Sequence, residues 1–219
     1  MDMNKKLLIY GINQQAQQLY YYLSMEGYCV EAFCVDKSYY KGNSLLNRPV
    51  VYFEKVSEIY PPCEYDMVLS FGYKNMVANR QEKYNLCRGL GYNMPSYISR
   101  DAKVYTNSIG KCVIIYPNVI IEPYVKIGDG CFIESSCSIG HHSIIGNFNF
   151  FALGVTTGGG IIVEDNCFFG LSSIISSCKK ISKRTIIGAG VCVTTDTDEG
   201  TVLKHSEAIS LSKEPEYYI

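Results

Sequence analysis

The chain contains no tryptophan, only three histidines in 219 residues, and no long run of apolar residues. A membrane-spanning helix needs about 18 or more consecutive apolar residues, so no membrane span is expected. The chain also lacks an excess of basic charge, because 20 Lys and Arg accompany 21 Asp and Glu, a net charge of −1. This balance argues against a nucleic-acid-binding protein. The apolar run in the amino-terminal MDMNKKLLIYG is too short for a signal peptide.

The ten cysteines do not form a disulfide or metal motif, since no pair has Cys-x-x-Cys spacing. Three of them, Cys131, Cys137 and Cys167, occupy one position of the repeat described below. We therefore predict a reduced, cytoplasmic protein that uses cysteine as a small buried residue. Hydrophobic residues make up 47% of the chain, which is enough material for a sizeable core.

A six-residue repeat runs through the second half of the chain. Stepping by six from Ile109 to Val193 meets fifteen positions, and fourteen of them are large and apolar, with Thr157 as the exception. The following position is Gly in seven cases and Glu in three. This period predicts a parallel β-helix in which three hexads form each triangular coil. Residues 109–198 supply five such coils, and we expect the glycines to occupy tight corners with positive φ.

The first hundred residues have different periods. Strand patterns at 5–11, 29–36 and 65–72 alternate with helical patterns at 14–27 and 75–90. This order predicts a small doubly wound α/β unit, with its ligand beyond the carboxyl ends of the strands, near Gly11, Asp36 and Gly72. Residues 92–106 follow neither period and are expected to join the halves, and no structure is evident after Val202.

Two adjacent histidines are the first candidates for chemistry. His141 and His142 fall between the apolar positions Ile139 and Ile145, so we expect them on the surface at a coil corner. They are either exposed turn residues or include a general base, because imidazole titrates near neutrality. A metal site is not favoured, since neighbouring side chains diverge and no third histidine is near.

The turn after the first strand is a weaker candidate. Gly11 opens GINQQAQ, which keeps only the first glycine of a dinucleotide-binding G-x-G-x-x-G. Asp36 stands about 25 residues later, near the place of an acid that bonds a ribose hydroxyl. A simple turn acid at a strand end explains Asp36 equally well.

Several motifs together resemble one protein family. They are LIYG near the start, FCVD, FG at 71–72, SCSIGHHSIIGNF, and IIGAGVCV near the end. Over about residues 5–203 the chain resembles the bacterial nucleotide-sugar acetyltransferases of the sialic-acid O-acetyltransferase and bacillosamine or perosamine N-acetyltransferase type. The resemblance implies a Rossmann-like α/β domain that binds the nucleotide sugar (1–99), a left-handed parallel β-helix of about five coils that carries acetyl transfer (100–203), and a tail (204–219). It also implies a homotrimer with acetyl-CoA between neighbouring β-helices.

The resemblance also assigns roles to residues. The catalytic base falls on His141, and His142 stands where much of the family has an acid beside the base. Two further sets are implied, for the nucleotide sugar Gly11, Asn13, Gln14, Gln15, Asp36, Lys37 and Gly72, and for acetyl-CoA Phe150, Gly159, Leu171 and Ala189. Two other departures are the amides Asn13-Gln14-Gln15 in the nucleotide turn and His205-Ser206-Glu207-Ala208 in place of a final Gly-x-Pro-Ala.

These features favour an acetyl-CoA-dependent N-acetyltransferase of bacterial surface-glycan biosynthesis. The neutral amine of a nucleotide-linked sugar would attack the thioester while His141 accepts the proton. A backbone N–H such as that of Gly159 would stabilise the oxyanion. The alternatives are a sugar O-acetyltransferase, which would depend more strongly on its base, and a trimeric scaffold that binds sugar nucleotides without catalysis.

Overall fold

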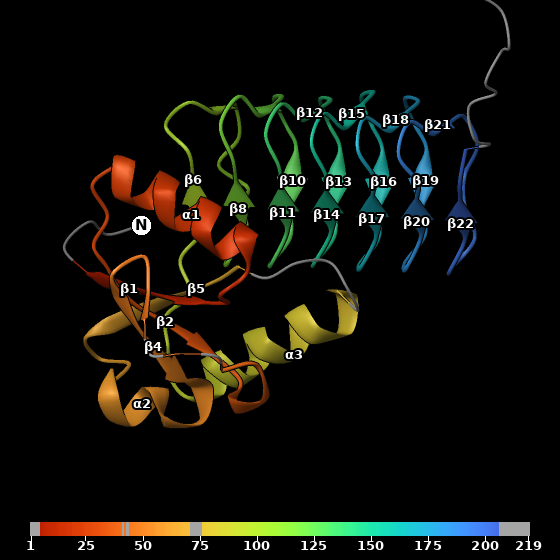
Figure 1. The fold of residues 1–219 in the computed structure, drawn as a ribbon. Helices are drawn as coiled ribbons and strands as arrows, with labels where there is room; N and C mark the ends of the chain where they lie inside the picture. Colours follow the sequence, from red (N-terminus) through yellow and green to blue (C-terminus); the bar gives the residue numbers. More distant parts are fainter. Residues whose placement is uncertain (1–4, 41, 43, 71–75, 206–219) are drawn as a thin grey trace, which may run out of the picture.

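The computed structural model describes residues 5–40, 42, 44–70 and 76–205, with residues 76–79 by their backbone alone. The amino-terminal part is a sheet with helices on its faces, and the remainder is a stack of short strands that extends away from it (Figure 1). In this described part, no helix is long and apolar enough to cross a membrane.

The α/β unit contains a five-stranded sheet in the order β3-β4-β2-β1-β5. All neighbouring strands are parallel except β3 and β4, which form an antiparallel pair that the sequence analysis did not predict. Its strands are β1 (Lys6–Tyr10), β2 (Val30–Val35), β3 (Ser44–Leu45), β4 (Arg48–Tyr52) and β5 (Tyr65–Leu69), and its helices are α1 (Gln14–Met25), α2 (Val56–Ile59) and α3 (Met76–Gly89). Two short 3-10 turns lie at Lys37–Tyr39 and Phe53–Lys55.

Helix α1 begins and ends as its sequence indicates. Asn13 is the N-cap, and its side-chain oxygen accepts a hydrogen bond of 3.0 Å from Ala16 N. The chain leaves the helix through Gly27, whose φ is 84°. The buried stripe of Ala16, Leu19 and Leu23 packs on one face of the sheet, while α2 and α3 lie beyond the other face (Figure 1).

The second part is a parallel β-helix with three faces, as the six-residue repeat predicts. Nearly every strand has two residues, the second of which points into the core. The first face consists of β6 (Tyr97–Ile98), β8 (Ile114–Ile115), β11 (Phe132–Ile133), β14 (Phe150–Phe151), β17 (Phe168–Phe169), β20 (Ile186–Ile187) and β22 (Val202–Leu203). The second consists of β7 (Lys103–Val104), β9 (Ile120–Ile121), β12 (Ser138–Ile139), β15 (Thr156–Thr157), β18 (Ile174–Ile175) and β21 (Cys192–Val193), and the third of β10 (Lys126–Ile127), β13 (Ile144–Ile145), β16 (Ile162–Val163) and β19 (Lys180–Ile181). Short parallel strands of this kind fit the left-handed β-helix that the resemblance implies.

The stack is longer than the five coils expected, because β6 and β7 precede them and β22 follows them. The coils at both ends are shorter than three hexads. Central strands pair three hexads apart, as Ile121 and Ile139 do. At the ends, Lys103 pairs with Ile120 and Ile186 with Val202, and both pairs are closer in sequence than the central ones. Residues 92–106, predicted to follow neither period and to join the halves, contain β6 and β7, which form the first coil of the stack out of phase with the hexads that follow. β6 also begins before residue 100, where the sequence analysis placed the domain boundary.

The glycines of the repeat have a different role from the one predicted. The positive-φ position lies three residues after each core position from Ile109 to Ile187 and is mostly not glycine, as at Tyr124 (66°) and His142 (59°). The repeat glycines directly after the core position do not have positive φ. A Cβ on Gly140, for example, would lie 2.5 Å from the backbone carbon of Gly158 in the next coil. These glycines therefore permit close approach between coils rather than a left-handed turn.

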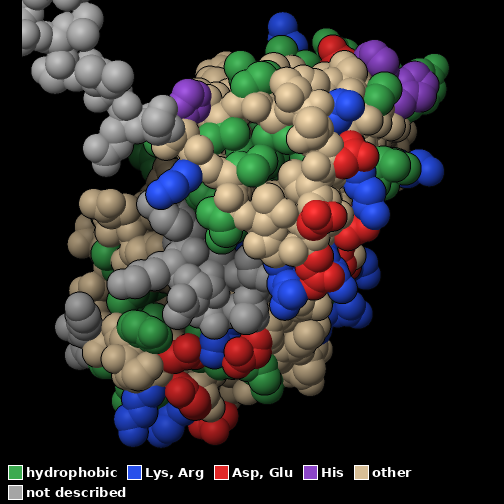
Figure 2. Space-filling model, turned by 90° about the vertical axis from the view of Figure 1, so that its right-hand side faces the viewer, with side chains coloured by type: hydrophobic (Ala, Val, Ile, Leu, Met, Phe, Trp, Pro, Cys, Tyr) green, Lys and Arg blue, Asp and Glu red, His purple; other side chains and the backbone are tan. Residues whose placement is uncertain are grey.

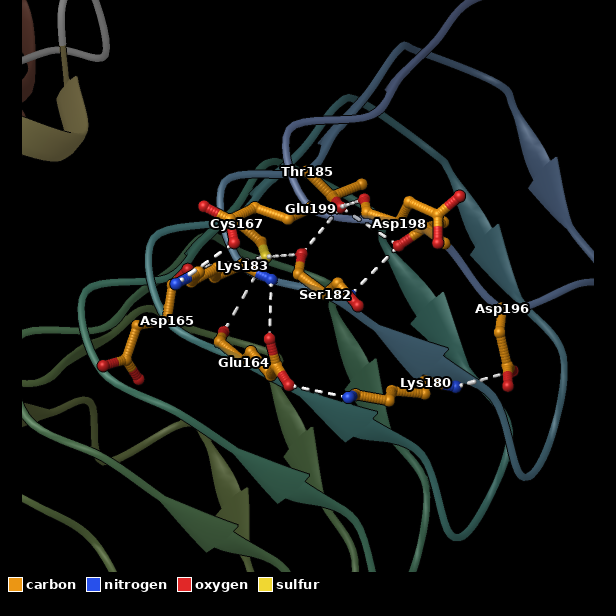
Figure 3. A network of polar contacts seen from close by, with 11 residues as sticks. Glu164, Asp165, Cys167, Lys180, Ser182, Lys183, Thr185, Asp196, Asp198 and Glu199 are labelled. Carbon is orange, nitrogen blue, oxygen red and sulfur yellow. Dashed lines mark hydrogen bonds and ion pairs between the residues drawn. The ribbon is translucent and has the colours of Figure 1, made fainter.

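Where the same position is glutamate, its side chain reaches the next coil. Glu122 accepts a hydrogen bond from the backbone N–H of His141 at 2.7 Å, Glu134 from that of Leu153 at 3.1 Å, and Glu164 from that of Lys183 at 3.0 Å. Figure 3 shows the Glu164 case, in which Lys180 Nζ also lies 2.8 Å from the Glu164 carboxylate. The glutamates thus satisfy corner N–H groups between successive coils.

The two parts share a hydrophobic core. The interior of the β-helix is filled by the second strand residues, with the Phe151 and Phe169 rings stacked at 4.3 Å. On the first face the outward side chains of Phe132 and Phe150 pack in one cluster with α1 and the sheet. The buried Arg80 of α3 donates hydrogen bonds to the carbonyl oxygens of Leu69, Cys112 and Gly130, which come from both parts. The α/β unit is therefore fixed against the first coils of the β-helix.

Candidate active site

The two adjacent histidines lie at the corner between β12 and β13, and both are exposed. Their predicted surface position is confirmed, and histidines are visible on the molecular surface in Figure 2. The backbone at this corner is tied to the coils on both sides. His142 N donates to Pro123 O at 3.1 Å, and Gly160 N donates to His141 O at 2.7 Å. Together with the hydrogen bond from His141 N to Glu122, these contacts hold the backbone of the corner against both neighbouring coils.

The two imidazoles face one another through their Nδ1 atoms. The Nδ1–Nδ1 distance is 3.0 Å, and the rings are nearly perpendicular at 86°. One Nδ1 must donate and the other accept, because two protonated or two unprotonated nitrogens cannot share a hydrogen bond. The ring of Tyr124, from the preceding coil, lies 4.6 Å from the His142 ring, centroid to centroid. The pair is therefore a hydrogen-bonded unit with an aromatic support.

Gly159 lies directly against the His141 ring. A Cβ at this position would lie 2.5 Å from Cε1 and 2.6 Å from Nε2 of His141. The Gly159 carbonyl accepts a hydrogen bond from Cys178 N at 2.9 Å. Its N–H donates no hydrogen bond to any residue that the structure describes. A backbone donor beside an imidazole is the arrangement that acyl transfer uses for an oxyanion and a base.

The other residues assigned to acetyl-CoA fall in two different environments. Leu171 and Ala189 are exposed and stand at the same corner of successive coils, where Gly190 N donates to Leu171 O at 2.8 Å. Phe150 is instead only 6% exposed and is stacked between Phe132 and Phe168. The structure thus does not place Phe150 with the other two. Leu153, 46% exposed and one coil before Leu171, occupies that corner, and the repeat spacing could have identified it.

The strand ends of the α/β unit bring together part of the predicted nucleotide site. Gly11 has a φ of 127°, and a Cβ there would lie 1.9 Å from Ser70 O, so only glycine fits. Asp36 follows the adjacent strand β2, as predicted. Gly72 lies outside the described residues. The arrangement agrees with a ligand site at the carboxyl edge of a parallel sheet.

Asp36 already has two partners in this structure. Its Oδ1 accepts a hydrogen bond from Tyr10 OH at 2.6 Å and lies 2.9 Å from Lys83 Nζ. Burial raises the pKa of Tyr10 above its usual range, and the hydrogen bond to Asp36 raises it further. Neither Tyr10 nor Lys83 was identified from the sequence. Lys83 is remote in the chain, and only the packing of α3 against the sheet brings it to Asp36.

The amide residues of the turn have separate environments. Asn13 caps α1, and Gln14 is exposed. Gln15 Nε2 donates to Glu134 Oε1 of the β-helix at 3.2 Å. Burial raises the pKa of Glu134, and the hydrogen bond from Gln15 opposes this. Lys37 is exposed, and its backbone N–H donates to Glu54 Oε1 at 3.3 Å. The predicted nucleotide turn is thus linked directly to the β-helix.

Within the described residues, no group of three or more His, Cys, Asp or Glu side chains is arranged to hold a metal ion. His205, the third histidine, is exposed at the end of the stack, after β22. The histidine corner brings together His141, His142 and the backbone of Gly159.

Comparison with known proteins defines the architecture first. No family model and no curated protein sequence matches the chain. Solved structures do match along nine-tenths of its length, and their TM-scores of 0.80–0.81 show a shared fold at sequence identities of only 17–21%. The chain therefore has the architecture of known acetyltransferase structures.

Three proteins illustrate this fold. The acetyltransferase domain of PglB from Neisseria gonorrhoeae FA1090 has a TM-score of 0.81 and 17% identity, covering 91% of this chain and 96% of its own. That domain has also been solved in complex with acetyl coenzyme A. PerB from Caulobacter crescentus, in complex with CoA and GDP-perosamine, has a TM-score of 0.81 and 21% identity, covering 90% and 92%. WeeI from Acinetobacter baumannii AYE has a TM-score of 0.80 and 20% identity, covering 90% and 95%.

Proposed function

We propose that this protein is an acetyl-CoA-dependent N-acetyltransferase that acts on a nucleotide-linked amino sugar. The observation that carries the proposal is the exposed His141 imidazole, held by His142 and lying against the backbone of Gly159. It occurs in a fold whose other members include structures bound to acetyl coenzyme A and to GDP-perosamine.

The proposed reaction uses His141 as the general base. The neutral amine of the sugar attacks the thioester carbonyl carbon, and His141 Nε2 accepts the proton that the amine releases. The Gly159 N–H donates to the oxygen of the tetrahedral intermediate, which then expels the thiolate of CoA. The remaining acceleration comes from holding the amine and the thioester together.

The α/β unit would serve as a Rossmann-like nucleotide-sugar domain. The close packing at Gly11 and the position of Asp36 support a site at this sheet edge. Asn13, Gln14 and Lys37 are the further contacts we propose there, together with Gly72. The contact between Gln15 and Glu134 supports a fixed geometry between this site and the β-helix.

We further propose that the protein is a homotrimer with acetyl-CoA in grooves between neighbouring β-helices. Exposed apolar side chains on the stack support contact with a second copy, among them Ile144 and Ile162, each 46% exposed on the third face. Gly159, Leu171 and Ala189 would contact the co-substrate. The buried position of Phe150 does not support the contact that the resemblance assigned to it.

The test is mass spectrometry of acetyl transfer to a panel of UDP-, dTDP- and GDP-linked 3-amino and 4-amino sugars, with sialic acid beside them. We expect one acetyl group on an amino sugar nucleotide. His141→Ala should lower the rate by about 10²–10⁴-fold, the usual contribution of a general base. His205→Ala is the matched control, because His205 is also exposed but lies at the end of the stack.

Different outcomes overturn different parts of the proposal. Acetylation of sialic acid alone would replace the amine acceptor by a hydroxyl. Undiminished turnover by a folded His141→Ala protein would remove His141 as the base. Binding of acetyl-CoA without transfer to any acceptor would instead favour a non-catalytic scaffold.

A further inference from the structure

We propose that Tyr124 is a positioning residue that acts through His142. It holds the His142 ring as the hydrogen-bond acceptor of His141 Nδ1–H, and thereby leaves His141 Nε2 unprotonated. The catalytic consequence rests on the proposed function. The pairing itself is a statement about the protein alone.

The contact between Tyr124 and His142 follows from the repeat. The two residues stand at the same corner of successive coils, and both have a left-handed backbone, with φ of 66° and 59°. Equivalent side chains in neighbouring coils are separated by one strand spacing, roughly 4.8 Å. The ring centroids lie 4.6 Å apart with an interplanar angle of 36°. The coil geometry therefore brings the two rings into contact.

Tyr124 has no evident role in folding. Its side chain is 71% exposed, and its ring packs against that of His142. An aromatic residue in a left-handed conformation at an exposed corner is unfavourable on its own. The contact with the His142 imidazole offsets part of this cost, because aromatic rings in contact attract one another.

The hydrogen bond between the imidazoles admits two tautomeric arrangements. If His142 were the donor, His141 would accept at Nδ1 and carry its proton on Nε2, where it could not take up another. If His141 is the donor, Nε2 is available, and its protonation leaves the bond to His142 intact. This second arrangement is the only one in which His141 gains a proton without rearrangement.

The charged and titratable groups that face the pair agree with His141 as the donor and His142 as the acceptor. Glu122 accepts the backbone N–H of His141, so its carboxylate lies beside the residue that would become cationic. Tyr124 covers His142 from the preceding coil. An imidazole partner accepts a hydrogen bond without contributing the negative charge of a carboxylate. The contribution of His142 is therefore to orient the His141 ring through their hydrogen bond, and the contact with Tyr124 holds the His142 ring in place.

Nitrogen-15 NMR of the histidine-labelled protein tests the pairing directly. Only three histidines contribute signals, and His205→Ala identifies the third. We expect the Nδ1–H tautomer for His141 and the Nε2–H tautomer for His142. Tyr124→Ala should shift His141 toward a mixture of tautomers, whereas Tyr124→Phe should keep the pattern of the unaltered protein. The Nε2–H tautomer at His141 in the unaltered protein, or an unchanged pattern in Tyr124→Ala, would overturn the inference.

Kinetics provide the second measurement. Tyr124→Ala should lower kcat about tenfold with little change in KM for acetyl-CoA, a smaller loss than removal of a base. Tyr124→Phe should restore the rate. Tyr21→Ala is the matched control, because Tyr21 is also 60% exposed but lies on α1 of the α/β unit, outside the β-helix. Full activity in Tyr124→Ala, with His141→Ala inactive, would refute only this inference. The expected tautomers without any acetyl transfer would refute only the proposed function.

Discussion

Replacing Gly159 by alanine tests the position of the His141 ring, because it would displace the ring without removing it. The added Cβ would lie 2.5 Å from Cε1 of His141, whereas ordinary contacts begin at 3.4 Å. The ring must therefore move by the difference between these distances. A misplacement of about 1 Å at a reacting group lowers rates about 10²-fold. We expect a loss of this size in kcat/KM, although the proposed base His141 is still present.

Stability should change little in Gly159→Ala, because the obstacle is an exposed side chain, which can turn aside without moving the backbone. Gly158→Ala is the contrasting variant. Its Cβ would lie 2.6 Å from the backbone nitrogen of Ser177, which the next coil holds in place. Such overpacking costs about 1–3 kcal/mol. We therefore expect Gly158→Ala to lower the free energy of unfolding, and Gly159→Ala to lower the rate.

The assay combines three measurements on both variants: initial rates of acetyl transfer, affinity for acetyl-CoA, and urea denaturation. Affinity is included because Gly159 is also a proposed contact of acetyl-CoA. The reasoning would be refuted if Gly159→Ala kept its full rate. It would also be refuted if the loss of rate were matched by an equal loss of acetyl-CoA affinity, since the ring position would then not be the cause.

Three further predictions concern stability and reactivity. Arg80→Met should lower the free energy of unfolding by about 2–5 kcal/mol in urea denaturation, because it leaves buried carbonyl groups in both parts of the chain without their donor; an unchanged value would show that the guanidinium does not join the parts. The raised pKa of Glu134 means that the folded protein binds this proton more tightly than the unfolded chain. Stability should therefore fall as the pH rises from the ordinary carboxyl pKa through the folded value, and Glu134→Gln should weaken this dependence in denaturation at several pH values. A thiol reagent should modify four cysteines in the native protein and the other six only after unfolding, because the exposed ones are Cys29, Cys63, Cys178 and Cys192.

The repeat predicted the core of the β-helix but not its ends. Every predicted core position from Ile115 to Val193 is buried, because a coil of three hexads preserves the six-residue phase. Val104 is out of phase with Ile109, so a search for a strict six-residue period could not identify its place in the stack. The positive φ expected of the glycines directly after a core position was wrong, because the close approach of the next coil, which depends on tertiary packing, is what requires glycine there.

The candidate site was predictable only where spacing carries information. The surface position of His141 followed from its distance to the core positions on either side. The partners of Asp36 did not, because Tyr10 and Lys83 come from other elements and meet Asp36 only through tertiary packing. The buried state of Phe150 was hidden for the same reason. An outward position of the repeat is exposed or buried according to whether the α/β unit covers it.

The contact between Gln15 and Glu134 has a consequence for how such a protein tolerates changes of length. Glu134 and His141 belong to the same coil, one corner apart. Gln15 of the α/β unit, which would bind the acceptor sugar, is therefore joined to the level of the stack that carries the proposed base. Each coil added or lost beyond that level changes the height of the molecule by about 4.8 Å without altering their separation. The number of coils beyond this level therefore does not affect the separation of Glu134 and His141. Under the proposed function, the distal coils would determine how much of an elongated acetyl donor the surface accommodates, while the reaction would stay at one level of the stack.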